Sequence, residues 1–105
     1  MSNISFKIMT KFFDQIAEGK KDYTLRIPDD KFNKMRMGDF VIAHDVSNEK
    51  RRLKMNGRRM ELEIRRIDTL KKSDSLSSYD IDDLKLAYGK NWKSDKYLQI
   101  WFKKY

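Results

Sequence analysis

Alternating apolar and polar residues near the start of the chain predict a β-strand followed by a short helix. Ile4, Phe6 and Ile8 alternate with polar residues, which is the two-residue period of a strand. We expect Thr10 to cap the helix and Gly19 to close it, because glycine readily adopts the left-handed conformation that ends many helices. The apolar side chains gathered on one side of this helix are Phe12, Phe13, Ile16 and Ala17.

The same period predicts two further strands before the middle of the chain. Residues 20–27 alternate through Tyr23, Leu25 and Ile27, and Pro28 ends the segment. A turn-rich stretch leads to a third strand at residues 40–44, FVIAH. Because this run is apolar without interruption, we expect it to be buried on both faces.

An Asn-Gly pair at residues 56–57 predicts a β-hairpin, since Asn-Gly is the preferred pair of a type I′ turn. A two-residue loop would place Leu53 opposite Met60 and Arg51 opposite Leu62. The side chains then expected on the core face are Leu53, Met55, Met60, Leu62 and Ile64.

The rest of the chain completes a small, mainly β fold of the α+β class. Residues 66–78 are expected to form a loop, Asp80 to cap a short helix that ends at Gly89, and residues 97–102 to form the last strand. Short antiparallel strands in this order predict a small β-barrel with two or three short helices at its ends. The length of 105 residues suits one domain spanning residues 1–105.

Composition narrows the possible functions. Lys and Arg number 24 against 16 Asp and Glu, so the net charge is +8, and polyanions such as RNA or DNA are the first partners to consider. No cysteine and one histidine, His44, argue against thiolate or His-rich metal sites and against a Ser-His-Asp triad. We expect no metal and no organic cofactor.

The chain is predicted to be cytoplasmic and to have no membrane partner. No apolar run approaches the roughly 18 residues that a membrane span needs. The first residues, MSNISFKIMTKFF, lack the long apolar stretch of a signal peptide.

Residues 19–26, G-K-K-D-Y-T-L-R, form the segment that most clearly suggests a binding site. Strand alternation would send Lys20, Thr24 and Arg26 to one face, where ammonium, hydroxyl and guanidinium groups could bind a phosphate or a carbonyl. The same pattern also describes the solvated face of an edge strand, and the pattern alone leaves both interpretations open.

This segment, with the first strand before it and M-G-D and an apolar strand after it, resembles the ASCH domain. That family belongs to a PUA-like β-barrel superfamily associated with RNA, and its signature is G-x-K-x-x-[E/T]-x-R followed by G-D. The resemblance covers residues 4–44 and rests beyond them on element order. It implies a PUA-like barrel.

Thr24 stands where many ASCH members carry Glu. A small bacterial branch carries Thr at this position and is similar in this motif; its members act as amidohydrolases on N4-acetylcytidine. By position, the resemblance implies that Lys21 acts as base and Thr24 as nucleophile, with Arg26 closing the motif.

Two points of this resemblance stay open. The branch uses a Glu ahead of the last strand, but residues 73–80, SDSLSSYD, contain none, and Asp74 and Asp80 are the substitutes to consider. Simple alternation also puts Lys21 and Thr24 on opposite faces. We therefore expect a bulge or kink near Asp22.

Basic residues crowd the predicted hairpin. They are Arg51, Arg52, Lys54, Arg58, Arg59, Arg65 and Arg66. Arginine suits phosphate binding and base stacking, although Glu61 and Glu63 would neutralise part of this face in cross-strand pairs. Trp92 lies in a polar basic segment, where it would either stack on a base or anchor a loop.

We therefore predict an RNA- or nucleotide-binding domain with a basic cleft. The predicted floor consists of Lys20, Lys21, Thr24 and Arg26, and the predicted rim consists of Arg51, Arg52, Arg58, Arg59 and Trp92. DNA is an open alternative partner. Two other functions remain: an amidohydrolase on N4-acylated cytidine, or a nuclease, that uses Lys21 and Thr24, and a small basic protein that binds and inhibits or regulates another protein.

Overall fold

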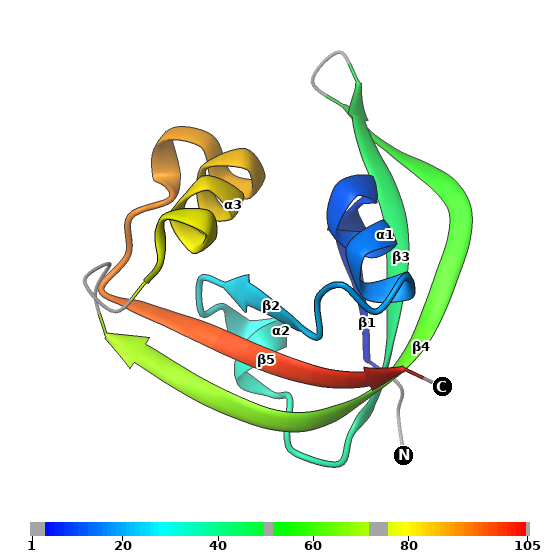
Figure 1. The fold of residues 1–105 in the computed structure, drawn as a ribbon, viewed down its shortest axis with the longest axis horizontal. Helices are drawn as coiled ribbons and strands as arrows, with labels where there is room; N and C mark the ends of the chain where they lie inside the picture. Colours follow the sequence, from blue (N-terminus) through cyan, green and yellow to red (C-terminus); the bar gives the residue numbers. More distant parts are fainter. Residues whose placement is uncertain (1–3, 50–51, 72–75, 105) are drawn as a thin grey trace.

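One curled five-stranded sheet forms most of the protein. The structure is a computed structural model and describes residues 4–49, 52–71 and 76–104 (Figure 1). In chain order the elements are β1 (Ile4–Met9), α1 (Thr10–Ala17), β2 (Tyr23–Arg26), α2 (Asp30–Asn33), β3 (Phe40–Glu49), β4 (Arg52–Lys71), α3 (Ser78–Tyr88), the 3₁₀ turn η2 (Gly89–Asn91) and β5 (Lys96–Lys104). The strand order is β1-β3-β4-β5-β2, and the sheet bends into a half-barrel (Figure 1). The expected small, mainly β fold of the α+β class with two or three short helices is confirmed at this level, since the described residues contain three α-helices.

The core fills the concave face of the half-barrel. Alternate residues of four strands point inward, and α1 covers them with its apolar side. The buried side chains include Phe6, Ile8, Val41, Ala43, Leu62, Ile64, Ile100 and Phe102 from the sheet and Phe12, Phe13 and Ile16 from α1. The rings of Phe6 and Phe102 stack with centroids 5.9 Å apart, so β1 and β5 meet across the core although they are not neighbours in the sheet.

The N-terminal strand and helix lie where the pattern predicts them, but Thr10 is not the helix cap. The N-cap of α1 is Met9, which makes no side-chain capping bond. Thr10 instead donates its hydroxyl hydrogen to the carboxylate of Asp45 on β3. Gly19 follows the end of the helix with a φ of 75°, in agreement with the predicted helix end.

The predicted burial of the third strand on both faces is wrong. Val41 and Ala43 are buried, but Ile42 is half-buried and Phe40 is exposed. The outer face of the sheet carries no helix against these residues, so only every second side chain enters the core (Figure 1). The expectation of antiparallel strands throughout is also wrong, because β1 and β3 pair in parallel.

The predicted hairpin at residues 56–57 is wrong. Both residues lie inside β4, where His44 pairs with Arg59 and Val46 pairs with Met55. Four residue steps of β4 therefore face two of β3, which is a bulge rather than a turn. Gly57 has a φ of 80°, so the bulge and the expected turn need the same left-handed backbone.

β3 and β4 stay paired as far as Glu49 and Arg52, which lie before residues 56–57 in the chain. The expected pairings of Leu53 and Leu62 are consequently wrong, since Leu53 pairs with Asn48 and Leu62 pairs with Val41; Arg51 lies outside the described residues. Met60, Leu62 and Ile64 are buried as expected, but Met55 is 50% exposed because it precedes the bulge.

A buried carboxylate holds the bulge together. Asp45 is 1% exposed and accepts hydrogen bonds from Thr10, from Asn56 Nδ2 at 3.2 Å and from Arg58 Nε at 2.8 Å. Burial alone would raise the pKa of Asp45, but the bonds from Thr10, Arg58 and Asn56 outweigh it and lower the pKa. Arg58 also binds Asp14 at 2.8 Å, so this cluster ties α1 to both strands.

The C-terminal third differs from the prediction mainly in the length of β4. The expected loop over residues 66–78 is wrong up to residue 71, because this part of β4 pairs with β5. Ser77, not Asp80, is the N-cap of α3; Asp80 completes a capping box as its third residue. Gly89 ends α3 as predicted. No helix in the described ranges has both the length and the apolar composition of a membrane span.

We expect Gly57→Ala to destabilise the fold by about 1–2 kcal/mol, because a non-glycine residue is strained at positive φ. Open space surrounds the position of the added Cβ, so the cost comes from the backbone alone. Denaturant unfolding measures the change. Gly57→Asn is the matched variant, since asparagine tolerates this conformation better; equal stability of wild type and Gly57→Ala would contradict the assigned bulge.

Asp45→Asn should destabilise the protein most at neutral pH. The pKa of Asp45 in the folded state lies below its usual value of 3.8, so its stabilising effect is complete above that value and is lost as the pH falls through the folded-state pKa. Unfolding free energies of wild type and variant should therefore differ by a constant amount above pH 3.8 and approach each other only below that value. Asp95→Asn, at an exposed position, is the control and should show no such convergence.

Candidate functional site

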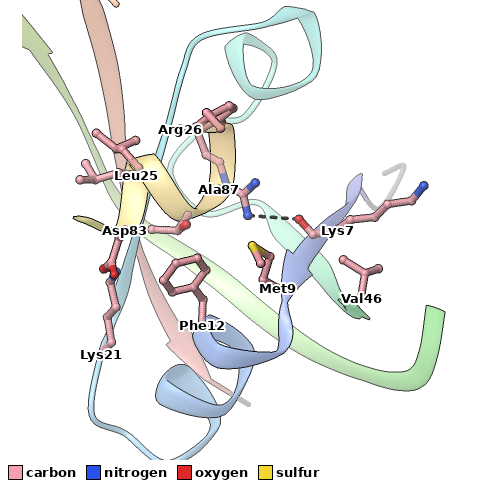
Figure 2. A pocket seen from close by; sticks show the side chains of 12 residues that line it. Lys7, Met9, Phe12, Lys21, Leu25, Arg26, Val46, Asp83 and Ala87 are labelled. Carbon is pink, nitrogen blue, oxygen red and sulfur yellow. Dashed lines mark hydrogen bonds and ion pairs between the residues drawn. The ribbon is translucent and has the colours of Figure 1, made fainter. Parts of the chain in front are cut away.

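A pocket of about 220 Å³ lies where the half-barrel fails to close, between its edge strands β1 and β2 (Figure 2). The polar residues that line it are Lys7, Lys21, Thr24, Arg26, Asp83 and Tyr88. The apolar residues that line it are Met9, Phe12, Leu25, Val46, Leu84 and Ala87. The pocket is therefore an apolar slot with charged and hydroxyl groups around it, the usual character of a small-ligand site.

Lys21 reaches this pocket because it stands outside the strand. The backbone N–H groups of Lys20 and Lys21 both donate to the carbonyl of Gln15, at 2.9 and 3.1 Å, and wrap the chain around the end of α1. β2 begins only at Tyr23, so strand alternation does not apply to Lys21. The predicted strand over residues 20–27 is therefore too long, and the pairing of β2 with β5 contains no bulge; Lys21 and Thr24 line the same pocket because Lys21 precedes the strand.

Asp83 on α3 is the partner of Lys21. Lys21 Nζ lies 2.8 Å from Asp83 Oδ2, and its side chain is only 13% exposed (Figure 2). The ammonium group also lies over the rings of Phe12 and Tyr23, at 5.1 and 4.9 Å from their centroids. Lys21 is therefore held in one place by a carboxylate and two aromatic faces.

Thr24 brings a free hydroxyl to the pocket. The residue is 6% exposed and sits in β2 opposite Ile100 of β5. Across residues 4–49, 52–71 and 76–104, its side chain makes no hydrogen bond. A hydroxyl in this condition can either bind a ligand or act as a nucleophile when a base is near.

Arg26 bridges the two edges of the open sheet. Its Nη2 donates to the backbone carbonyl of Lys7 on β1 at 3.1 Å (Figure 2). The guanidinium lies over the rings of Phe6 and Phe32, 5.3 and 5.1 Å from their centroids. Burial lowers the pKa of Arg26 from its usual value, against smaller opposite effects of Tyr88 and Asp29.

Helix α3 forms the outer wall of the pocket. Asp83, Leu84, Ala87 and Tyr88 share one side of the helix, at the spacing of successive turns. A hydrogen bond of 2.7 Å from the hydroxyl of Tyr23 to Asp80 fastens the helix to β2.

The hydrogen bond between Tyr23 and Asp80 is part-buried. Burial, together with the bond to Asp80 and the charges of nearby aspartates, raises the pKa of Tyr23 above its usual value. Tyr23 therefore stays protonated and keeps donating to Asp80 over the physiological pH range.

The free edge of β2 also offers backbone groups to the pocket. The N–H of Phe102 donates to the carbonyl of Asp22, and the N–H of Ile27 donates to the hydroxyl of Tyr88 on the opposite side. Because backbone groups alternate along an antiparallel strand, the N–H and C=O of Leu25 point away from β5. They face the pocket that Leu25 lines.

Other residues of the predicted site lie elsewhere. Lys20 is 73% exposed and pairs with Glu18 at 3.0 Å, outside the pocket. Arg58 binds Asp45 and Asp14, as described above, and Arg59 lies exposed on β4. The structure brings three of the four predicted floor residues together and leaves out the fourth.

Trp92 is half-buried rather than free in a loop. Its ring packs against the second apolar cluster, formed by Leu25, Leu84 and Tyr97, and lies near the ammonium groups of Lys85 and Lys93. The predicted rim residue Arg51 falls outside the described residues, as does the side chain of Arg52.

The sequence interpretation missed Asp83 and Tyr88. Asp80 was considered as an acidic group, but it caps α3 and binds Tyr23, while Asp74 is outside the described residues. Asp83 lies three residues after Asp80 in a predicted helix. Residues at this spacing share one face of a helix, so the sequence could have indicated that Asp83 lies on the same side as Asp80. No group of three or more His, Asp or Glu side chains suited to a metal occurs in the part of the chain that is described.

Comparison with known proteins gives the fold and the family. A solved structure described as hypothetical protein PH0355 superimposes with a TM-score of 0.68 at 13% sequence identity, over 99% of this chain and 100% of that one, so the two share a fold. No curated protein matches the sequence. The family described as Domain of unknown function (DUF3850) matches residues 4–81, and the chain belongs to that family.

Proposed function

We propose that the pocket binds a nucleobase, either in a free nucleoside or nucleotide or as an unstacked base of an RNA strand. One observation carries this proposal: Lys21, Thr24 and Arg26 surround a single apolar slot. A planar ring suits walls made by side chains such as Phe12 and Leu84. The surrounding hydroxyl, ammonium and guanidinium groups would bind the polar edge of that ring.

The overall charge supports a nucleic-acid or nucleotide ligand. The excess of eight positive charges raises the local concentration of phosphate-bearing molecules. The likeness of residues 4–44 to ASCH domains points the same way, and under this proposal the half-barrel is of the PUA-like type. The small pocket volume favours one base rather than a stretch of strand.

Titration with cytidine and with a short single-stranded RNA tests the binding proposal. Amide resonances of residues 21–27 and 83–88 should shift, since these segments line the pocket. Lys21→Ala should weaken binding about tenfold, because it removes a charge-assisted donor. Lys20→Ala removes an equal charge outside the pocket and should change little; shifts confined to β3 and β4 would contradict the proposal.

A second candidate function is hydrolysis of an N-acyl group on cytidine. The free Thr24 hydroxyl and the Lys21–Asp83 pair are the specific observations that favour it. Asp83 supplies the carboxylate that the amidohydrolase branch provides with Glu. In this role Asp83 holds Lys21 Nζ in place at 2.8 Å, and the free-amine form of Lys21 is the base.

The proposed reaction forms and breaks one bond at a time. Thr24 Oγ1 attacks the acyl carbonyl carbon while its proton passes to Lys21 Nζ. The C–N bond then breaks, and the exocyclic amine leaves with that proton. Water hydrolyses the acyl-threonine ester by the same route, with Lys21 returning a proton to Thr24 Oγ1.

Incubation with N4-acetylcytidine, followed by chromatography for cytidine, tests the catalytic proposal. Thr24→Ala should abolish turnover, Thr24→Ser should retain part of it, and Lys21→Ala should lower it by about a hundredfold or more. Lys20→Ala is again the control. Tight binding without cytidine release would leave the pocket as a binding site only and reject the hydrolase.

A further inference from the structure

Arg26 differs from Lys21 and Arg58 because, among the described residues, it has no carboxylate partner. Lys21 pairs with Asp83, and Arg58 pairs with Asp45. Within the described ranges, no carboxylate oxygen lies within 4.0 Å of Arg26. Asp29 acts on it only from a longer distance.

The protein satisfies the guanidinium of Arg26 only in part. Nη2 is bonded to the carbonyl of Lys7, while Nε is buried and, among described residues, without a hydrogen-bond partner. Two phenyl faces replace the water that a cation would otherwise bind. A buried charge without an opposite charge is costly, so a negatively charged group brought to Arg26 would recover stabilising energy.

The surroundings of Arg26 are suited to receive such a group. Lys21 and Arg26 bring two cationic groups to the pocket against one carboxylate, Asp83, while the ammonium group of Lys7 points away from it (Figure 2). Tyr88 accepts a hydrogen bond from the Ile27 N–H at 3.1 Å, which leaves its own hydroxyl hydrogen available to donate. The Arg26 end of the pocket therefore presents donors and positive charge, whereas the only carboxylate of the lining pairs with Lys21.

We propose that a phosphate of the ligand binds at Arg26 and Tyr88, so that the pocket selects a nucleotide over the corresponding nucleoside. This inference rests on the proposed binding of a nucleobase in the same pocket. The phosphate oxygens supply the opposite charge that Arg26 lacks and accept hydrogen bonds from its guanidinium and from the neighbouring Tyr88 hydroxyl. The phosphate belongs either to a free nucleotide or to the backbone of an RNA strand.

Calorimetric titration of the full chain tests the selection without any substitution. Cytidine 5′-monophosphate should bind at least about tenfold more tightly than cytidine, as expected for charge-assisted bonds that the nucleoside cannot make. A short RNA is the third ligand. If RNA binds more tightly than the monophosphate, the bound phosphate belongs to an RNA strand. If the monophosphate binds more tightly than RNA, the bound phosphate belongs to a free nucleotide. Equal affinity for cytidine and its monophosphate overturns the inference while leaving base binding intact. Failure of all three ligands rejects the proposed function itself.

Substitution of Arg26 tests the residue assignment. Arg26→Met should weaken binding of the monophosphate by a clearly larger factor than binding of cytidine, so that the two ligands bind the variant with similar affinity. Lys20→Met removes the same charge next to the pocket and controls for long-range attraction. Thermal unfolding checks that the variants fold, because Arg26 also joins β2 to β1.

Tyr88→Phe keeps the aromatic ring and is the second variant if Arg26→Met does not fold. It should weaken binding of the monophosphate more than binding of cytidine. Equal loss for both ligands in either folded variant would show that the residue acts only through the structure of the pocket, and would overturn the assignment.

Discussion

The open seam of the half-barrel, and the single guanidinium that spans it, determine what this protein can do. β1 and β2 are the two ends of the sheet order and do not pair with each other. Arg26 connects them through the Lys7 carbonyl while resting on the rings of Phe6 and Phe32. A closed barrel would fill this space with backbone hydrogen bonds. The open one leaves a lined pocket, free edge groups and a cation for a ligand.

The sequence predicts elements well where one period dominates, and fails where long-range pairing decides. Alternation through Phe6 and Ile8, and through Ile100 and Phe102, is clear because one face of each strand is buried. The Asn-Gly pair misleads because a type I′ turn and a bulge both need positive φ at glycine. Asp45 favours the bulge: it is buried, and two of its three hydrogen-bond donors, Asn56 and Arg58, come from the bulged strand. No local pattern reveals these contacts.

Only part of the candidate site could be predicted from the sequence, again because long-range packing decides the rest. Lys21, Thr24 and Arg26 come from one short segment, so a motif can identify them together. Asp83 and Tyr88 come from a helix about 60 positions away, at separations of 62 and 61 residues in their bonds to Lys21 and Ile27. Only the packing of α3 on β2 brings them to the pocket. Spacing along the chain contains no sign of that packing.

The position of β2 at the edge of the sheet affects how the protein is made. Among the described strands β2 pairs only with β5, so the segment that carries the pocket has no sheet partner while the ribosome is still building the chain up to residue 96. β1 and β3 can already pair in parallel, and β4 can add to them. Vectorial synthesis would therefore assemble the scaffold first and the pocket last. A nascent chain stalled before β5 would carry residues 19–26 without the pocket.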